Sequence, residues 1–439
     1  MLLKEKLLNS FSELEDKPEL IKNSELKEIR TRALDKFKKN GFPTKKEEEW
    51  KYTSLSQILK QDYKLFSSEP GTDDDHKKIQ KFLLKETASY NLVFINGCFS
   101  KKLSDTTADG IDISTMSAVR SDERYRHKIN QHFNKLAKEN CGFININTAL
   151  NLDGAYIDIP DNTHVEKKIQ ILNFFTDNDQ QILTQPRNLI MLGRGTEVSI
   201  IERCQTVDGL QSLTNAVTEI FLQKNANLKY HKIQNDSDQA ALIDTTYISQ
   251  NRDSLVSLGT YTFGGKLVRN NITFIQNDEN CRSLLNGITI IDKKQHVDNH
   301  TVIHHRSKNC ESYELYKGIY KEEATGVFNG KVIVDSEAQK INAYQQNSNL
   351  LTGEKASINT KPQLEIFADD VKCSHGCTIG QIDENALFYM QQRGISKKKA
   401  ELLLKYAFAA EILDTIEIDE LKKNIKQYIL EKLKLEKGF

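Results

Sequence analysis

A short segment near the end of the chain places two thiols and an imidazole at alternate positions. Cys373, His375 and Cys377 are each two residues apart, so in an extended strand all three side chains point to the same side. Two thiols and an imidazole form a row of soft ligands, of the kind that zinc binds. Successive side chains would stand roughly 6.7 Å apart, too far for one ion to bind all three unless Gly376 bends the strand. Two interpretations stay open, a single ligand given to a shared metal site or a buried strand with inert thiols.

A run of histidines is the second candidate for a metal site. His296, His300 and His304 are four residues apart, and His305 follows. The intervening β-branched residues favour a strand, in which the first three histidines share a face but stand roughly 13 Å apart. One ion cannot bridge that distance. We therefore expect structural histidines with hydrogen-bond partners of their own, and a metal site is the alternative.

Nucleotide binding and nucleophilic catalysis are not predicted. The segment Gly259–Lys266 is similar to a phosphate loop, but Leu267 stands where Ser or Thr would hold magnesium. Gly193–Gly195 is only a fragment of a dinucleotide fingerprint. Ser374 and His375 are adjacent, so their side chains diverge in a strand. We expect a protein that is not an enzyme and hydrolyses no ATP by itself.

The composition is that of a globular protein with balanced charge. The chain has 439 residues, 61 basic and 61 acidic, and 38% are hydrophobic, enough for one large core or two to three smaller ones. No apolar run is long enough for a membrane helix and no signal peptide is evident, so we expect a cytoplasmic protein that does not span or bind a membrane. The zero net charge offers no positive field for nucleic acid. The seven scattered cysteines predict reduced thiols.

The pattern divides the chain into three regions. Residues 1–152 are expected to be mainly helical, because apolar residues recur at helical spacing in several segments. The expected elements are helices over 3–14, 24–40, 44–50 and 121–138 and strands over 90–98 and 111–114. Asn23 and Ser24 are candidate caps of the second helix, and Asn40-Gly41 is its expected stop. A capping box of Thr44 with Glu47 would begin the third helix.

Residues 153–383 change to short β-branched segments between polar clusters, which predicts many strands and few helices. Their spacing fits a sandwich or a stacked solenoid. The scarcity of proline favours the solenoid, because strands in a stack hydrogen-bond on both edges. No regular sequence period supports it, however. Residues 384–439 return to helical spacing. Their apolar stripe of Leu421, Ile425, Tyr428, Ile429 and Leu433 is expected to pack on the chain's own core rather than on a partner.

A nearly unbroken series of motifs runs from about Lys317 to Leu413. It comprises Lys317-Gly318-Ile319-Tyr320, Gly326-Val327-Phe328-Asn329-Gly330-Lys331-Val332, Ala338-Gln339-Lys340, Asn349-Leu350-Leu351, Thr360-Lys361-Pro362-Gln363-Leu364-Glu365-Ile366, Ala368-Asp369-Asp370-Val371-Lys372-Cys373-Ser374-His375-Gly376, Leu387-Phe388-Tyr389 and Arg393-Gly394-Ile395. Weaker motifs stand earlier, at Gly41-Phe42-Pro43-Thr44-Lys45, Glu49-Trp50-Lys51-Tyr52 and Pro186-Arg187-Asn188. Over its whole length the chain resembles the SufD branch of the SufB/SufD family, the non-ATPase scaffold subunits of the SUF iron–sulfur cluster assembly machinery.

The resemblance implies a fold and a set of partners. The fold would be mainly β, a right-handed parallel β-helix flanked by helical N- and C-terminal domains. The chain would pair with SufB through the β-helix and dock the SufC ATPase through its C-terminal helical region, residues 384–439. Within this complex of SufB, SufC and SufD it would assemble iron–sulfur clusters and bind no nucleotide itself. ATP binding in SufC would drive a rearrangement that opens the interface between SufB and SufD.

The resemblance also implies a site. The family's cluster ligand at the SufB interface corresponds to His375, and Cys373 is the second residue to inherit a role. The cluster would be transient and shared, since a cubane needs four ligands and SufB must supply the remainder. At Cys377 the family more often has Ala, and we expect this thiol to pack rather than to bind metal.

Two other functions remain as alternatives. A β-helix enzyme acting on carbohydrate would use Asp369 and Asp370 as paired carboxylates. Neighbours on a strand face opposite sides, which disfavours that pair. A purely structural paralogue that only supports its partners is the other alternative.

Overall fold

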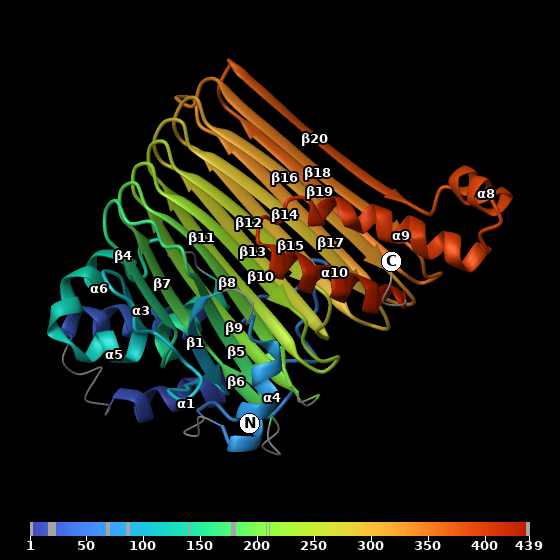
Figure 1. Cartoon of the computed structure of the whole chain (residues 1–439). Coiled ribbons are helices and arrows are strands. Elements are labelled where there is room, and N and C mark those ends of the chain that lie inside the picture. The colour runs from blue at the N-terminus through green and yellow to red at the C-terminus, as the bar shows by residue number, and fades with distance from the viewer. Residues whose placement is uncertain are drawn as a thin grey trace.

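The chain folds as a β-solenoid with helices at both ends (Figure 1). The computed structural model describes residues 3–15, 23–66, 71–84, 88–138, 141–176, 181–207, 209 and 211–435. Two long sheets face each other, and the chain alternates between them as it advances. Within the stack every neighbouring pair from β5 to β20 and from β4 to β19 is parallel. The mainly β fold with flanking helices and the parallel solenoid are therefore confirmed.

Each sheet is named here after its last strand. The β20 sheet runs in the order β2 (Cys98–Phe99), β1 (Ser89–Ile95), β5 (Lys168–Phe175), β8 (Glu197–Thr206), β10 (Asn227–Gln234), β12 (Leu255–Thr262), β14 (Arg282–Ile291), β16 (Glu311–Tyr320), β18 (Ile341–Leu351) and β20 (Val371–Gly380). The β19 sheet runs in the order β19 (Ser357–Ile366), β17 (Thr325–Val334), β15 (His296–His305), β13 (Leu267–Gln276), β11 (Ala241–Gln250), β9 (Ser212–Leu222), β7 (Arg187–Leu192), β4 (Ala155–Ile159) and β3 (Asp112–Thr115), with β6 (Ile182–Thr184) beside β9.

The helices lie before and after the stack. Those of the first half are α1 (Leu3–Glu15), α3 (Ser24–Asn40), α4 (Asp73–Ile79), α5 (Met116–Ser121), α6 (Arg126–His132) and α7 (Gly142–Leu150), with short 3-10 turns η1 (Glu48–Trp50), η2 (Gln80–Phe82) and η3 (Glu123–Tyr125). The C-terminal helices are α8 (Glu384–Gln392), α9 (Lys397–Leu413) and α10 (Asp419–Leu433). Among the helices that the structure describes, none has the length and apolar character needed to cross a membrane.

The predicted ends of the second helix are confirmed. The side chain of Asn23 accepts a hydrogen bond from the backbone N–H of Leu26, and the N–H of Gly41 donates to the carbonyl of Phe37. Gly41 has a φ of 68°, a left-handed value that glycine adopts without strain. The third helix is wrong in extent, because only η1 forms there. Thr44 and Glu47 do interact, through the backbone N–H of Thr44 and a carboxylate oxygen of Glu47.

The helix expected over 121–138 is also wrong in extent, for a long-range reason. It is reduced to η3 and α6, and the chain then turns at Asn134, whose φ is 58°. The carboxylate of Glu219 accepts the backbone N–H groups of Asn134, Leu136 and Ala137. Glu219 is fully buried and pairs with the equally buried Arg187 at 2.6 Å. A buried carboxylate that requires donors thus outweighs the local helical pattern.

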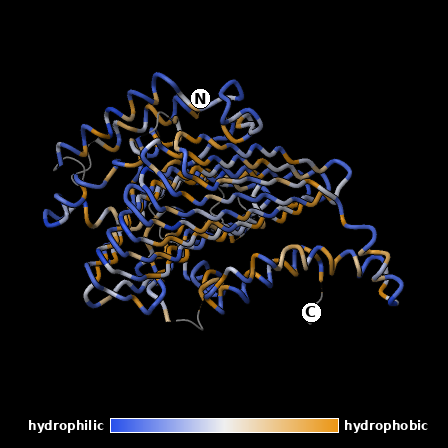
Figure 2. Tube along the Cα trace, turned by 90° about the horizontal axis from the view of Figure 1, so that it is seen from above, coloured by the Kyte–Doolittle hydropathy of each residue, from blue (hydrophilic) through white to orange (hydrophobic). Residues whose placement is uncertain are grey.

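The solenoid core is built from columns of aligned side chains. One column on the β20 sheet contains Ile200, Tyr230, Leu258 and Leu285, all fully buried and aligned from turn to turn. Figure 2 shows hydrophobic and hydrophilic residues alternating along the strands, as the two faces of such a sheet require. This alternation places one set of residues between the sheets, where burial of apolar area stabilises the fold.

The stripe on the last helix packs on the solenoid, as expected. Leu421, Ile425, Ile429 and Leu433 are buried in one cluster with residues of the β20 sheet such as Ile288, while Tyr428 is partly buried beside it. Polar contacts fix the same helices, because Arg203 donates to the hydroxyl of Tyr428 at 2.7 Å and to Asn424 at 2.9 Å. The stripe is therefore occupied by the chain's own core.

The column of Leu285 becomes polar toward the C-terminal end of the solenoid. Glu314 follows Leu285 and Gln345 follows Glu314 in register, and both side chains are buried. The amide of Gln345 donates to Oε2 of Glu314 at 2.7 Å. Burial raises the pKa of Glu314 to about 7, so folding favours its neutral form.

Replacing this carboxyl by its neutral isostere makes stability less dependent on pH. A pKa raised by folding means that wild-type stability falls as pH rises from about 4.5 to about 7. We expect Glu314→Gln to change the free energy of unfolding little at pH 5 and to increase it by on the order of 1–3 kcal/mol at pH 8. Urea titrations at both pH values measure this change. Arg194→Gln is the control, because Arg194 belongs to an exposed ion pair with Asp161. An equal effect of Glu314→Gln at the two pH values would contradict the assignment.

Candidate functional site

Strand β20 carries the three predicted metal-ligand candidates and lies at the open end of the solenoid. Cys373 aligns with Ala343, His375 with Gln345 and Cys377 with Asn347 on β18. Because those β18 residues are buried, the three candidates continue inward-facing columns. The prediction that they share one face is confirmed. The pairing of β20 with β18 is continuous over Val371–Gly380, so the strand has no bend at Gly376 that would gather the three ligands on one ion.

The three side chains differ in exposure. Cys373 is half-buried, whereas His375 and Cys377 are exposed. Burial raises the pKa of the Cys373 thiol, which disfavours its thiolate. Cys377 lies 3.0 Å from the hydroxyl of Thr360 on β19, so this thiol faces across the interior toward the opposite sheet. Among the described residues no group of three or more His, Cys, Asp or Glu side chains is placed to hold a metal ion. The three side chains are thus spaced along the strand as separate ligand candidates.

The edge beside these residues is unpaired. Both β19 and β20 are terminal strands, each bonded to a neighbour on one side only within the part of the chain that the structure describes. Large apolar side chains are exposed near this end, namely Tyr344, Ile366, Phe367 and Ile379. Unpaired backbone groups beside exposed apolar side chains are the usual features of an edge that receives another strand.

Beneath His375 lie two residues that sequence reasoning missed. Gln345 and Glu314 precede His375 in its column, in that order. They lack a recognisable motif, and the step between aligned residues is irregular. It is 27 residues from Leu258 to Leu285, 29 from Leu285 to Glu314 and 31 from Glu314 to Gln345. A regular period would have revealed the column.

The histidine run is structural in this fold. His296 lies 2.9 Å from the hydroxyl of Thr53 and 2.6 Å from that of Thr325. His300 is held between Glu49 at 3.0 Å and Asp298 at 2.9 Å. His304 and His305 have separate partners, the former Asp335 at 2.8 Å and the latter Ser312 at 3.0 Å. Each of the four histidines thus has a partner of its own, as expected.

These contacts fasten the N-terminal segment to the β19 sheet. Asp298 also pairs with Arg269 at 2.6 Å, and the guanidinium of Arg269 lies 3.8 Å from the ring centroid of Trp50. The positive neighbours hold the pKa of Asp298 well below its usual range despite its burial, and the two carboxylates raise the pKa of His300. The motif Glu49-Trp50-Lys51-Tyr52 thus has a packing role.

The positions of Asp369 and Asp370 do not support the hypothesis of paired catalytic carboxylates. Asp369 and Asp370 are both exposed in the turn before β20. The backbone N–H of Asp370 donates to Gln339 at 2.9 Å, which fixes this turn to the preceding one. Ser374 aligns with Tyr344 on the outer face, so it lies on the opposite side of β20 from His375.

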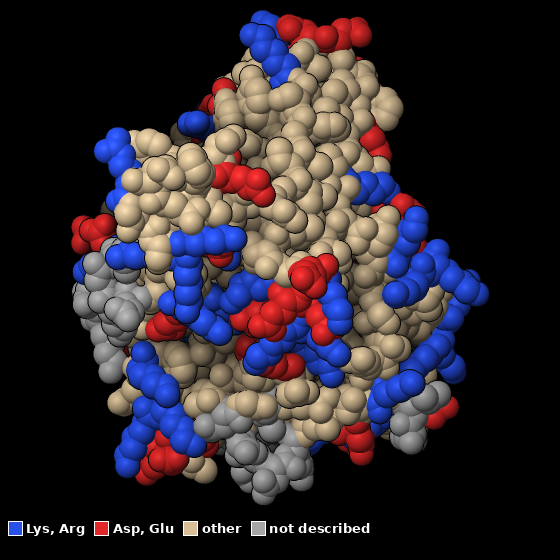
Figure 3. All heavy atoms as spheres, turned by 90° about the vertical axis from the view of Figure 1, so that its right-hand side faces the viewer, with Lys and Arg blue, Asp and Glu red and all other residues tan. Residues whose placement is uncertain are grey.

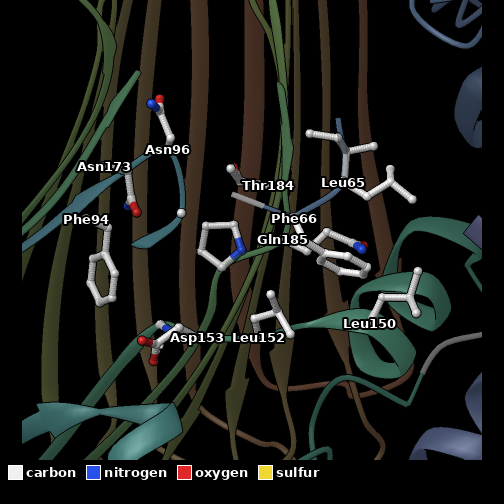
Figure 4. A pocket seen from close by; sticks show the side chains of 14 residues that line it. Leu65, Phe66, Phe94, Asn96, Leu150, Leu152, Asp153, Asn173, Thr184 and Gln185 are labelled. Carbon is white, nitrogen blue, oxygen red and sulfur yellow. Dashed lines mark hydrogen bonds between the residues drawn. The ribbon is translucent and has the colours of Figure 1, made fainter. Parts of the chain in front are cut away.

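A small cavity lies among early elements of the fold, away from β20 (Figure 4). It has a volume of about 40 Å³ and lies between the turn at Asn96, the strand β6 and the segment around Asp153. Leu150 and Phe94 are among the apolar residues that line it. A space of this size suits a few water molecules and brings none of the predicted ligands together.

Comparison with known proteins agrees with the fold and the motifs. The family model of the SUF system FeS cluster assembly SufBD core domain matches residues 174–408, and that of the SufBD protein N-terminal region matches residues 1–171. The chain belongs to the SufBD family. This family acts in iron–sulfur cluster assembly by the SUF system, which the sequence motifs had implied.

Individual relatives support the same assignment. An iron–sulfur cluster assembly SufBD family protein of Synechocystis is 34% identical over 405 residues, covering 90% of this chain and 89% of the relative. SufD of Escherichia coli is 28% identical over 403 residues, covering 91% of each chain. SufD of Bacillus subtilis is 26% identical over 452 residues, covering 97% of each chain. The similarity to SufD proteins thus extends over nearly the whole molecule.

The exposures predict an order of cysteine alkylation. In the native chain we expect iodoacetamide to modify Cys377 first and Cys373 more slowly, because Cys373 is half-buried and its pKa is raised. Cys204, Cys281 and Cys310 are buried, so we expect them to react only after unfolding. Peptide mass spectrometry over time at pH 8 measures the order. Modification of Cys281 as fast as Cys377 in the native chain would contradict the structure.

Proposed function

We propose that this chain is a SufD-type scaffold subunit, which assembles iron–sulfur clusters together with a SufB-type paralogue and the SufC ATPase. His375 contributes a ligand to the nascent cluster where the two solenoids meet, and Cys373 is the second ligand candidate. The observation that carries the proposal is the placement of His375 on the inward face of the terminal strand β20, whose outer edge has no partner strand among the described residues. A ligand at that position becomes enclosed only when another subunit covers the edge.

The unpaired edges favour a partner of similar architecture. β19 and β20 are the last strands of two sheets that face each other, so the open end presents two parallel edges at the spacing of a solenoid. A second solenoid end can extend both sheets at once, which satisfies the backbone groups and covers the exposed apolar residues. A paralogue of the same fold meets this requirement. A second copy of this chain would meet it as well and is an outcome that the experiment below distinguishes.

The C-terminal region, residues 384–439 in our division of the chain, is the proposed docking region of the ATPase. α9 and α10 are attached to the β20 sheet, so their apolar stripe is occupied. α8 instead extends beyond the sheet (Figure 1) and exposes Phe388 and Tyr389, with 63% and 60% of their surface accessible. In Figure 3, which views the molecule from the α8 side, the upper part is largely uncharged and the charged side chains gather below. Arg393 lies over the ring of Tyr389, and two exposed aromatic rings beside an arginine suit a protein partner.

We further propose that the chain acts in the cytoplasm, that it is not itself an enzyme and that it binds no nucleotide. The division into a helical region at 1–152, a β-helix core at 153–383 and a C-terminal region at 384–439 is our proposal for its domain boundaries. The cluster would be transient and shared, because β20 offers separate ligands at intervals along a straight strand. The partner must then supply the remaining ligands.

The role of His375 is tested by its removal from the assembled complex. We expect His375→Ala to copurify with the organism's SufB and SufC as well as wild type does, because the side chain is exposed. Its reconstituted cluster should fall by about tenfold or more, as for lost metal-site groups. Anaerobic reconstitution followed by absorbance and Mössbauer spectra measures the loss, with the exposed His164→Ala as control. Clusters at the wild-type level in His375→Ala would overturn the ligand assignment.

The composition of the purified complex also tests the partner. A tag on this chain should retain a SufB-type subunit in equal amount. Recovery of this chain only as a pair of copies, with both other subunits present, would instead assign the open edges to self-association.

The ATPase docking region is tested separately. We expect Phe388→Asp to lose copurification of SufC while keeping the SufB-type subunit, because a charge would have to be buried at the contact. Tyr52→Asp is the control, since Tyr52 is also an exposed aromatic residue and lies far from α8 in the sequence. Unchanged SufC recovery with Phe388→Asp would place the docking surface elsewhere.

A further inference from the structure

Gln345, the residue that precedes His375 in its column, is buried and hydrogen-bonded. Gln345 is 3% exposed, and its Nε2 donates to Oε2 of Glu314 at 2.7 Å. In this hydrogen bond the amide nitrogen of Gln345 is the donor and the carboxyl oxygen of Glu314 is the acceptor. The carbonyl oxygen of Gln345 is buried and has no hydrogen-bond partner among the described residues. A buried acceptor without a donor is unfavourable by roughly 1–3 kcal/mol, so its presence calls for an explanation.

The opposite sheet provides room for this amide. A Cβ atom at Gly330 on β17 would lie 2.2 Å from Nε2 and 2.7 Å from Cδ of Gln345. Real Cβ atoms do not approach other atoms so closely, so the amide occupies the space that a side chain at position 330 would need. Gly330 does not have a positive φ, and its backbone does not require glycine. The glycine leaves space for the amide of Gln345 and for the ring of Phe328, whose Cζ would lie 2.9 Å from the same Cβ.

The next side chain in the column is His375. It aligns directly with Gln345 across one strand spacing, which is about 4.8 Å. At that separation an imidazole N–H can donate to the carbonyl oxygen of the amide beneath it. A histidine that binds metal through one ring nitrogen usually donates from the other, and that hydrogen bond fixes both its tautomer and its orientation.

We propose that Gln345 is a positioning residue for His375: Glu314 and Gly330 hold its amide so that its carbonyl oxygen accepts the imidazole N–H, which leaves the other ring nitrogen to bind iron. The proposal rests on the proposed function in one respect only, namely that His375 is a ligand. The proposed hydrogen bond would join two residues of this chain and needs neither a metal nor a partner subunit. It explains both the unpartnered oxygen and the glycine on the facing strand.

The tautomer of His375 is the direct readout, and it requires no metal. We would label the full chain with ¹⁵N-histidine and assign the His375 signals by their absence in His375→Ala. At pH 8 we expect one neutral tautomer in wild type and a mixture of both in Gln345→Ala. Gln346→Ala is the matched control, because Gln346 is the adjacent residue of the same type and is exposed on the other face. It should leave the His375 signals unchanged.

Gly330→Ala disturbs the amide without altering Gln345, and it should produce the same mixture. Circular dichroism and the thermal midpoint show whether each variant folds. If Gly330→Ala does not fold, the comparison of wild type with Gln345→Ala alone decides the proposal. In the complex with SufB and SufC we expect Gln345→Ala to slow cluster assembly by about tenfold. Wild-type ¹⁵N signals of His375 in Gln345→Ala would overturn the proposal.

The two proposals fail in different ways. If the tautomer depends on Gln345 but clusters form normally in His375→Ala, the positioning contact exists and the ligand role of His375 is wrong. If clusters require His375 but its tautomer is the same with and without Gln345, the ligand role holds and the positioning role is wrong.

Discussion

The need of every strand edge for a hydrogen-bonding partner governs this molecule. In the parallel stack each turn hydrogen-bonds to the backbone groups of the turn before it. Unpaired backbone groups therefore remain only on the first and last strands of each sheet. At the N-terminal end the sheets finish in β2 and β3, short antiparallel strands within a helical region. At the C-terminal end they finish in the long strands β19 and β20 without such a cover among the described residues. The chain continues from β20 into helices that fold back along the β20 sheet and leave its last edge free (Figure 1).

The same stacking explains how an apolar core leads to a polar site. Side chains at aligned positions form columns, so the character of a column can change from one turn to the next. The column that holds Leu258 and Leu285 changes to Glu314, then Gln345, and reaches the open end as His375. His375 thus follows Gln345 in an inward-facing column, and it is exposed because no further turn of the described chain covers it. An iron–sulfur cluster shared between subunits requires ligands presented in this manner, rigidly held yet open on one side.

Sequence patterns over a few residues predicted the features of this structure that depend on short-range geometry. The caps at Asn23 and Gly41 and the common face of Cys373, His375 and Cys377 follow from short-range geometry, and the structure has them. The helix expected over 121–138 failed because the buried carboxylate of Glu219, about eighty residues later, takes the backbone N–H groups of that segment. Gln345 and Glu314 escaped notice because the number of residues per turn varies, which hides the column from any search for a fixed repeat. The ligand role proposed for His375 comes from the family resemblance, because residue types alone left it open.

The central claim is that the open edges of β19 and β20 receive the SufB-type subunit. Hydrogen–deuterium exchange of this chain, alone and mixed with that subunit, tests it most directly, because unpaired edge amides exchange readily and amides in a sheet ladder are protected. The account predicts that peptides covering Ser357–Ile366 and Val371–Gly380 exchange rapidly in the isolated chain and become strongly protected in the complex, while the central strands do not change. Protection confined to α8, α9 and α10, with the edge strands unaffected, would contradict it.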